Sequence, residues 1–307
     1  MKLRVYACSL ILLATSPAGL AYDLPPVNLG ATSFLDVAPS PPGWYFLQYA
    51  QHYRANKFKD VNGNNLPLPG PEFDVTLGLT QLIYGSDQEL MGGKLGFQAF
   101  LPEVSPHTSY SVAGGGPEAG DSDFGDLVMG PFITWGPLME SKFFTRIELT
   151  TVLPTGKYDR NREINPGSNI WSFNPFWSGT YFFTPELSAS VRLHYLWNGK
   201  NDEPNRSFGA AKDVRPGQAF HVNFATEYAF TPQLRLGING YWLKSTTDTE
   251  VNGHDVKGRR EQVLGLGVGG VYSFSQRNHL FFNFYDESQA ENRTEGQRYN
   301  LRYVHAF

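Results

Sequence analysis

Cysteine is almost absent from this sequence, since Cys8 is the only one in 307 residues. No stretch beyond the first 21 residues approaches the roughly 18 apolar residues that a membrane-spanning helix needs. Positive charge is not in excess either, because the net charge is −4 and the isoelectric point is near 6.0. These absences exclude a small disulfide-stapled scaffold and a helical membrane protein, and they give no reason to expect a nucleic-acid partner.

Aromatic residues and glycine are abundant instead. The chain contains 23 Phe, 16 Tyr, 6 Trp and 32 Gly, although only 41% of its residues are hydrophobic and the mean hydropathy is −0.34. A polar average combined with many aromatic residues suits an all-β chain in which one face of each strand is apolar. A closed barrel can use a chain of this length as a single unit.

The first 42 residues differ in composition from the rest. Residues 1–21 contain two basic residues, an apolar run of about ten residues and small residues ending at Ala21, which is the pattern of a secretory signal peptide. Cys8 lies inside this peptide, so we expect a mature chain without cysteine. Residues 22–42 are rich in proline and do not alternate, and we expect them to form either a loose periplasmic tail or a plug in the barrel mouth.

Apolar and polar residues alternate along many segments after residue 43. In 187–197, for example, Leu193 and Tyr195 fall on one face, and Arg192 and His194 fall on the other. Such alternation predicts β-strands with one apolar and one polar face. Each run spans about ten residues, whereas strands of soluble proteins usually have about five or six. The same pattern occurs at 142–153, 219–230, 234–242 and 298–307.

Connections between these segments come in two sizes that alternate along the chain. Short ones such as 84–90, 181–187 and 228–234 place an aromatic residue before a tight polar turn. Long alternating strands joined by short turns on one side and long loops on the other are typical of outer-membrane β-barrels. The long polar loops are expected at 57–70, 104–122, 154–168, 199–215 and 247–259.

The pattern therefore predicts an all-β fold, a transmembrane antiparallel up-and-down β-barrel of about 12 strands formed by residues 43–307 in the bacterial outer membrane. A soluble β-sandwich also explains the alternation and the turns, but it leaves the strand length and the signal peptide unexplained. The last strand ends on the aromatic Phe307. We expect this strand to pair with the first, to be read by the outer-membrane assembly machinery, and to assemble poorly without Phe307.

The apolar parity of the strands faces the outer-membrane lipids in this fold, and the polar parity faces the lumen. Charges of both signs on the polar parity either pair across strands and fill the interior or form a polar constriction past which a solute moves. Gly265, Gly267 and Gly269 on that parity either leave room in the lumen or let the sheet bend. The candidate lumen residues are Arg54, Lys94, Asp126, Arg146, Glu148, Arg192, His194, His221, Glu227, Arg235, Glu261 and Arg302.

Catalytic and metal sites are only weakly indicated. His107 and Ser109 have the His-x-Ser spacing of lipid A deacylases, but they fall in an expected loop and no carboxylate is placed beside them. The acidic run at 121–126 resembles a calcium loop without its later bidentate acid, and a solvated loop mouth explains it. We therefore expect no enzyme, no cofactor and no bound metal.

Six ordered motifs carry a resemblance to a known family. They are "DFGDLVMGP", "LPTGKYD", "NPGSNIWSFNP", "HYLWNGKND", "RPGQAF" and "GINGYWLKSTTDTEVNG", and "VNLGATSFLD" precedes them. In these motifs the chain resembles the meta-pathway phenol degradation family of bacterial transporter-like proteins. The resemblance implies an outer-membrane barrel that is associated with the catabolism of aromatic or other hydrophobic compounds and admits them. It implies neither a catalytic residue nor a cofactor.

The same motifs supply the expected mouth of the barrel. Lys157, Tyr158 and Asp159 follow the turn in "LPTGKYD", and Trp171 returns the chain to the membrane interface. The expected function is a porin-like channel that admits small hydrophobic or aromatic solutes. The alternatives are a structural barrel with a filled lumen and a lipid-modifying barrel of the deacylase type.

Overall fold

The structure is a computed structural model that describes residues 23–38 and 40–307. The expected signal peptide at 1–21 lies outside the described residues. No helix in the described part of the chain is long and apolar enough to cross a membrane. The regular structure in this part consists of β-strands and one short 3₁₀ helix, η1, at Arg206–Phe208.

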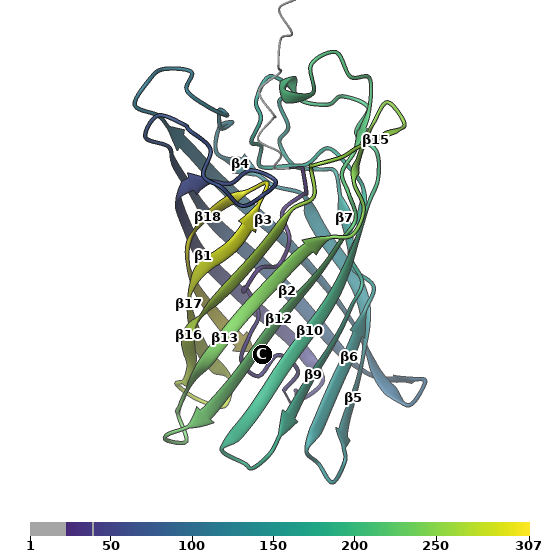
Figure 1. The fold of residues 1–307 in the computed structure, drawn as a ribbon. Coiled ribbons are helices and arrows are strands. Elements are labelled where there is room, and N and C mark those ends of the chain that lie inside the picture. The colour runs from purple at the N-terminus through teal and green to yellow at the C-terminus, as the bar shows by residue number, and fades with distance from the viewer. Residues whose placement is uncertain (1–22, 39) are drawn as a thin grey trace, which may run out of the picture.

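Fifteen strands form one antiparallel sheet that closes on itself (Figure 1). Their bounds are β1 Gly43–Phe58, β2 Glu72–Leu90, β3 Gly93–Ser109, β4 Asp123–Phe124, β5 Leu127–Leu138, β6 Phe143–Glu148, β7 Thr151–Leu153, β8 Ser172–Phe173, β9 Phe176–Phe182, β10 Leu187–Asn198, β12 Ala219–Ala229, β13 Leu234–Ser245, β16 Gln262–Ser273, β17 Asn278–Glu291 and β18 Thr294–Ala306. Three barrel strands are each interrupted once, so that β4 continues into β5, β6 into β7 and β8 into β9. The sheet therefore has twelve barrel strands.

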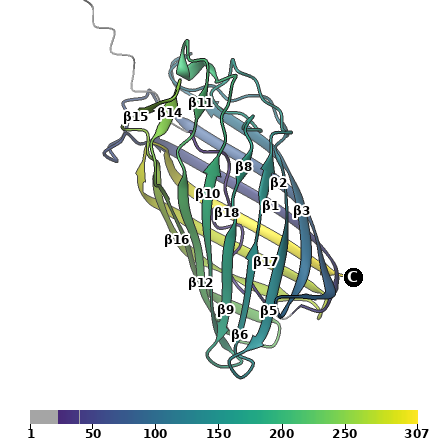
Figure 2. The same cartoon turned by 90° about the vertical axis from the view of Figure 1, so that its right-hand side faces the viewer.

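The two ends of the barrel differ in their connections. Tight turns join the strands at one end, which we call the turn end. Most of the connections at the other end, which we call the loop end, are long, and they carry a small second sheet (Figure 2). The strands of that sheet are β11 Val214–Arg215, β14 Thr249–Val251 and β15 His254–Val256.

The pairing of β1 with β18 closes the barrel. Tyr45 pairs with Ala306 near the turn end, and the N–H of Phe307 donates to the carbonyl of Trp44 at 3.0 Å. Because the first and last strands pair, the sheet has no free edge along this seam. The predicted antiparallel barrel of about 12 strands is confirmed.

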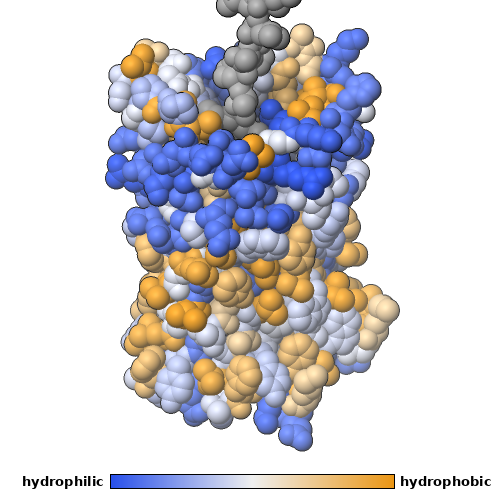
Figure 3. Space-filling view, in the orientation of Figure 1, coloured by the Kyte–Doolittle hydropathy of each residue, from blue (hydrophilic) through white to orange (hydrophobic). Residues whose placement is uncertain are grey.

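Apolar side chains cover the outside of the barrel toward the turn end. In β10, Leu187 and Tyr195 are 36% and 42% exposed, whereas Ser188 and His194 on the opposite parity are buried. Figure 3 shows an apolar belt on the visible face and a hydrophilic band above it, nearer the loop end. Alternation along each strand thus separates an apolar outer surface from a polar interior.

Two connections differ from those that the sequence predicts. β2 continues to Leu90, so the segment 84–90 is strand rather than turn, and the chain reverses at Met91 and Gly92. β3 continues to Ser109, so the following loop begins later than expected. Alternation missed the end of β2 because the register shifts by a bulge between Gly85 and Glu89, which breaks the period of two.

Candidate functional site

The N-terminal segment, residues 23–38, lies inside the barrel. Figure 1 shows it as the purple chain that runs through the lumen between the loop end and the turn end. Its hydrogen bonds go to side chains of the barrel wall, such as Asn223 and Thr180. The segment is therefore attached to the wall by side-chain contacts and does not extend the sheet.

Asp23 holds the segment at the loop end. Its carboxylate accepts from Nε and Nη2 of Arg259 at 2.8 and 2.6 Å and from the hydroxyl of Thr249 at 2.7 Å. Glu261 accepts the backbone N–H groups of Asp23 and Leu24 at 2.9 Å each. The Asp23 side chain is only 3% exposed, so breaking this pair leaves a buried charge without its partner.

Gly30 lies in close contact with the barrel wall. Its φ is +76°, and a Cβ at this position would lie 2.5 Å from the Tyr285 ring. The Gly30 carbonyl accepts from the Tyr285 hydroxyl at 3.0 Å and from Asn300 Nδ2 at 2.9 Å, while its N–H donates to Asn223 at 2.9 Å. Glycine alone combines this backbone conformation with so close an approach.

The glycines of β16 make room for side chains in the interior. A Cβ on Gly265 would lie 2.3 Å from the Tyr241 ring, and Tyr241 packs edge-on against Tyr285 with ring centroids 5.0 Å apart. Leu24 and Leu29 of the N-terminal segment belong to the same buried cluster. The space beside Gly265 is therefore filled by Tyr241 and is not open lumen.

Asp36 holds the segment in the half of the lumen toward the turn end. Its carboxylate accepts from Nε and Nη2 of Arg192 at 2.8 and 2.6 Å, and the two side chains are 3% and 10% exposed. The N–H of Val37 donates to the Thr180 hydroxyl at 3.0 Å. Phe34 lies fully buried between these contacts and Gly30.

A row of buried, hydrogen-bonded polar side chains runs along the inside of the barrel wall, with members on β1, β2, β3 and β6. The Tyr49 hydroxyl donates to Gln81 at 2.8 Å, and Gln81 donates to Gln98 at 2.5 Å. Gln98 and Thr150 both donate to Oε1 of Glu148. Oε2 of Glu148 has no hydrogen-bond partner among the described residues, so the predicted lumen residue Glu148 keeps one free acceptor.

The predicted lumen residues His194 and His221 stack face to face. Their ring centroids are 4.1 Å apart and the planes differ by 11°, and both side chains are buried. Neither ring nitrogen of His194 has a hydrogen-bond partner in the described part of the chain. Glu227, also predicted for the lumen, is buried and accepts from the Ser188 hydroxyl at 2.6 Å.

Two predicted lumen residues lie elsewhere, and their placement is corrected. Arg54 points outward with a side chain that is 64% exposed, and it faces Glu72 at 3.5 Å. The reason is that in β1 the apolar parity faces the interior, with Tyr53 and Ala55 buried, so Arg54 on the opposite parity points outward. Lys94 lies in the hairpin at the turn end and pairs with Glu89 at 3.0 Å, again with both side chains exposed.

Three further predicted lumen residues lie at different levels of the barrel: Asp126 at the loop end, Arg235 at the turn end and Arg302 in the interior. At the loop end, the Asp126 carboxylate accepts the N–H groups of Gly156 and Ser168 at 2.9 and 2.8 Å and so holds two parts of the β7–β8 loop together. At the turn end, Arg235 donates to two carbonyl groups of the β9–β10 turn. Arg302 is buried, with its guanidinium carbon 3.8 Å from the centroid of the Phe281 ring.

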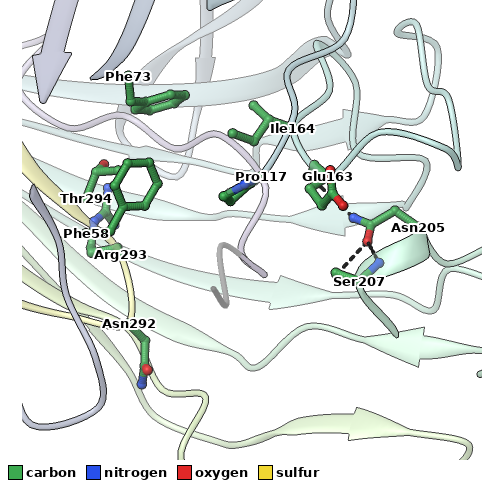
Figure 4. Close-up of a pocket in the computed structure, with 10 residues that line it drawn as sticks. All are labelled: Phe58, Phe73, Pro117, Glu163, Ile164, Asn205, Ser207, Asn292, Arg293 and Thr294. Carbon is green, nitrogen blue, oxygen red and sulfur yellow. Dashed lines mark hydrogen bonds between the residues drawn. The ribbon is translucent and has the colours of Figure 1, made fainter. Parts of the chain in front are cut away.

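A small pocket lies under the loops at the loop end (Figure 4). Phe58 and Phe73 pack with ring centroids 6.2 Å apart and form its apolar side. Its cavity of about 20 Å³ has room for roughly one water molecule. The remaining lining residues are Pro117, Glu163, Ile164, Asn205, Ser207, Asn292, Arg293 and Thr294.

The predicted mouth residues shape the loops at this end. The Tyr158 hydroxyl donates to the Glu203 carbonyl at 2.9 Å, and the Asp159 carboxylate accepts the N–H of Asn161 at 2.9 Å. The N–H of Lys157 donates to the carbonyl of Phe124, and the carbonyl of Lys157 accepts from the N–H of Gly167. Trp171 is 58% exposed on the outside just before β8. Loop architecture thus accounts for their contacts.

Glu163 clamps two loops together over the pocket. Its carboxylate accepts from Nε and Nη2 of Arg206 at 2.6 and 3.0 Å and from the N–H of Glu118 at 3.0 Å. Partial burial on its own raises the pKa of the Glu163 carboxyl, but the bonds from Arg206 and Glu118 favour the charged form and leave the pKa below its ordinary value. The clamp therefore binds as a carboxylate.

Acidification is expected to open this clamp. A carboxyl with a lowered pKa stabilises the fold above its ordinary pKa, and this stability is lost as the pH falls through the lowered value. Limited proteolysis of the folded protein should therefore cut the loops around Glu163 faster at a pH well below the ordinary glutamate value than at pH 7. Glu163→Gln should show fast cutting at both pH values; a variant that keeps the wild-type pH dependence contradicts the assignment.

An open groove lies at the turn end, between the β5–β6 and β9–β10 turns. Its volume is about 470 Å³. Phe144 and Phe182 form its deep wall, packed edge to face with centroids 6.1 Å apart. The remaining lining residues are Glu140, Ser141, Lys142, Phe183, Thr184 and Pro185. Alternation alone did not reveal this groove, because it depends on how two distant turns meet.

The weakly indicated pair of His107 and Ser109 does not form a catalytic arrangement. His107 and Ser109 lie on β3 rather than in a loop, and His107 is exposed. The Ser109 hydroxyl donates to Glu72 at 3.2 Å rather than to the histidine. A serine nucleophile needs a base within hydrogen-bond reach, and this geometry does not supply one.

The fold and the lumen define this protein as a β-barrel of the outer-membrane type. Among solved structures, the COG4313 outer membrane channel from Pseudomonas putida F1 has the same fold, with a TM-score of 0.76 and 19% identity over 88% of this chain and 97% of that chain. The transport unit of the autotransporter AIDA-I from Escherichia coli aligns with a TM-score of 0.51 and 11% identity over 89% of this chain and 93% of that chain.

The family is shown by the sequence. Residues 55–303 match the family described as "Putative MetA-pathway of phenol degradation", and the chain belongs to this family. The resemblance that the ordered motifs carry is therefore confirmed. No curated protein sequence matches the chain.

Proposed function

We propose that this protein is a channel of the bacterial outer membrane that admits small hydrophobic or aromatic compounds. In this proposal the apolar belt contacts the lipids, the loop end faces the outside of the cell and the turn end faces the periplasm. The observation that carries the proposal is the lumen itself. A closed barrel surrounds a segment, residues 23–38, that is bound to the wall by side chains and can leave without breaking the sheet.

The N-terminal segment acts as the plug of this channel. Asp23 and Asp36 fasten it near its two ends, and the rings of Tyr241 and Tyr285 hold Gly30 between them. The phenol degradation context in the family description supports an aromatic solute, and the fold shared with the COG4313 outer membrane channel supports a channel. Aromatic side chains at both ends of the lumen, Phe58 and Phe73 at one and Phe144 and Phe182 at the other, suit such a solute.

Uptake by whole cells tests the proposal, because the intact outer membrane retards hydrophobic solutes. Cells that lack the gene and cells complemented with it are given labelled toluene, phenol and benzoate in turn. We expect complementation to restore the initial uptake rate of at least one of these compounds, while uptake of glycerol stays the same. Equal rates for all three aromatic compounds with and without the protein contradict the proposed function.

A further inference from the structure

The place that Asp23 occupies at the loop end has the geometry of a carboxylate-binding site. Nε and Nη2 of Arg259 donate to the Asp23 carboxylate at 2.8 and 2.6 Å, and the hydroxyl of Thr249 donates to it at 2.7 Å. The Phe208 ring covers one face of the guanidinium, with its centroid 4.7 Å from the guanidinium carbon. Proteins commonly bind carboxylates through the two parallel N–H groups of an arginine. Three donors thus surround one carboxylate, which here belongs to the chain itself.

Apolar side chains surround the residue that follows Asp23. Leu24 is 6% exposed and belongs to a buried cluster that includes Leu196, Leu243 and Val263 of the barrel wall. Consecutive Cα atoms are about 3.8 Å apart, so the place of the carboxylate and the place of the Leu24 side chain adjoin each other. When the segment undocks, the wall therefore presents an anion-binding fork beside apolar surface.

The charges at this place balance only while a carboxylate is present. Asp23 pairs with Arg259, and Glu261 pairs with Arg293 at 3.3 Å. The four side chains are between 1% and 13% exposed. Withdrawal of Asp23 leaves two arginines and one carboxylate, and a buried charge without its partner is costly. A carboxylate from solution restores the balance.

The other fork that binds the segment lies deeper in the lumen. Arg192 holds Asp36 in the half toward the turn end. Arg146, which the sequence also predicts for the lumen, turns its guanidinium onto the Phe132 ring, with 3.9 Å between the guanidinium carbon and the ring centroid. The place of Asp23 is therefore the carboxylate position that a solute entering from the loop end meets before that of Asp36.

We propose that Arg259 and Thr249 form a binding site for small carboxylates with an apolar body, a site that Asp23 and Leu24 fill in the closed channel. A solute such as benzoate places its carboxylate on the Arg259 fork and its ring against the apolar surface that Leu24 covers. Segment and solute compete for one site, so the bound solute favours the state in which the loop-end part of the segment is undocked. The inference rests on the proposed function and names a substrate class that releases the plug.

Benzoate binding to the folded, detergent-solubilised full chain, measured by isothermal titration calorimetry, tests this competition. Asp23→Asn removes the competing charge and should strengthen benzoate binding by about tenfold or more, because the apparent affinity scales with the fraction of protein in the competent state. Asp248→Asn removes a carboxylate from the exposed Arg260 pair and should change the affinity by less than about threefold. Benzamide, which has the ring but no charge, should gain much less than benzoate from Asp23→Asn.

Removal of the fork should cancel the gain. In the Asp23→Asn background, Arg259→Gln should return the benzoate affinity to the wild-type level or below. Arg259→Lys keeps the charge but not the planar fork and should bind benzoate more weakly than Asp23→Asn alone, and Thr249→Val should weaken binding by a smaller factor. These two variants keep the test decisive if Arg259→Gln folds poorly. The heat-dependent gel mobility typical of folded barrels confirms folding in each case.

Three results overturn the site: Asp23→Asn binds benzoate no more tightly than the wild type, the folded Arg259 variants keep the gain, or benzamide gains as much as benzoate. Restored toluene uptake by cells, without a gain in benzoate binding by Asp23→Asn, overturns the site alone. A gain that depends on Arg259, in a protein that restores uptake of no aromatic compound, overturns the channel and supports the site.

Discussion

Replacing Asp36 by asparagine is expected to open the channel. The Asp36–Arg192 pair is buried, and removing one partner of a buried pair costs about 3–5 kcal/mol because the other charge is left uncompensated. A change of this size multiplies the population with an undocked segment by more than about a hundredfold. In planar bilayers, Asp36→Asn should therefore spend a much larger fraction of time in a high-conductance state than the wild type.

Asp248 supplies a matched control for this experiment. It binds Arg260 with the same two-point geometry, at 2.9 and 3.0 Å, but the Arg260 side chain is 50% exposed in a loop. Exposed pairs contribute about 0–1 kcal/mol, so Asp248→Asn should leave the conductance as it is in the wild type. If Asp36→Asn conducts like Asp248→Asn, the segment is not a plug held by Arg192.

Placing an arginine on the apolar belt is expected to destabilise the barrel strongly. Val268 lies in the middle of β16 and is 58% exposed on the outer face. An arginine on the lipid face costs about 2–4 kcal/mol at the middle of the bilayer. Val268→Arg should lower the free energy of unfolding by about this amount when folding is measured by urea titration in phospholipid vesicles.

The turn after β16 provides the control for the belt. Gln276 is exposed in the β16–β17 turn, where water solvates an added charge, so Gln276→Arg should change the unfolding free energy by less than about 0.5 kcal/mol. A Val268→Arg protein as stable as Gln276→Arg would show that this part of β16 does not face lipid.

Alternation predicted the fold well because its cause is simple. Each strand of a barrel separates lipid from lumen, so the period of two reappears in segments such as 187–197, which the structure has as β10 at Leu187–Asn198. The pattern failed in β1, where the apolar parity faces the interior. Tyr53 and Ala55 are buried there, so Arg54 on the opposite parity points outward.

The contents of the lumen were far less accessible from the sequence. Arg146, Glu148 and Arg192 could be assigned to the interior by parity, but their partners come from segments distant in the chain. Asp23 and Asp36 carried no periodic pattern, because the segment that contains them follows the lumen rather than the sheet. The acidic residues of this proline-rich segment were an available signal, but parity alone could not match them to Arg259 and Arg192.

The course of residues 23–38 constrains the order in which the protein can assemble. The segment is continuous with β1, which starts at the turn end, yet Asp23 binds at the loop end. The closed sheet therefore surrounds a segment of its own chain, and pairing of β1 with β18 encloses that segment. The segment must enter the lumen before β1 pairs with β18 or while they pair, or it must move through the closed barrel afterwards. A bulky globular domain fused ahead of Asp23 should then trap the chain with an empty lumen, whereas a short flexible peptide should pass and emerge beside the long loops.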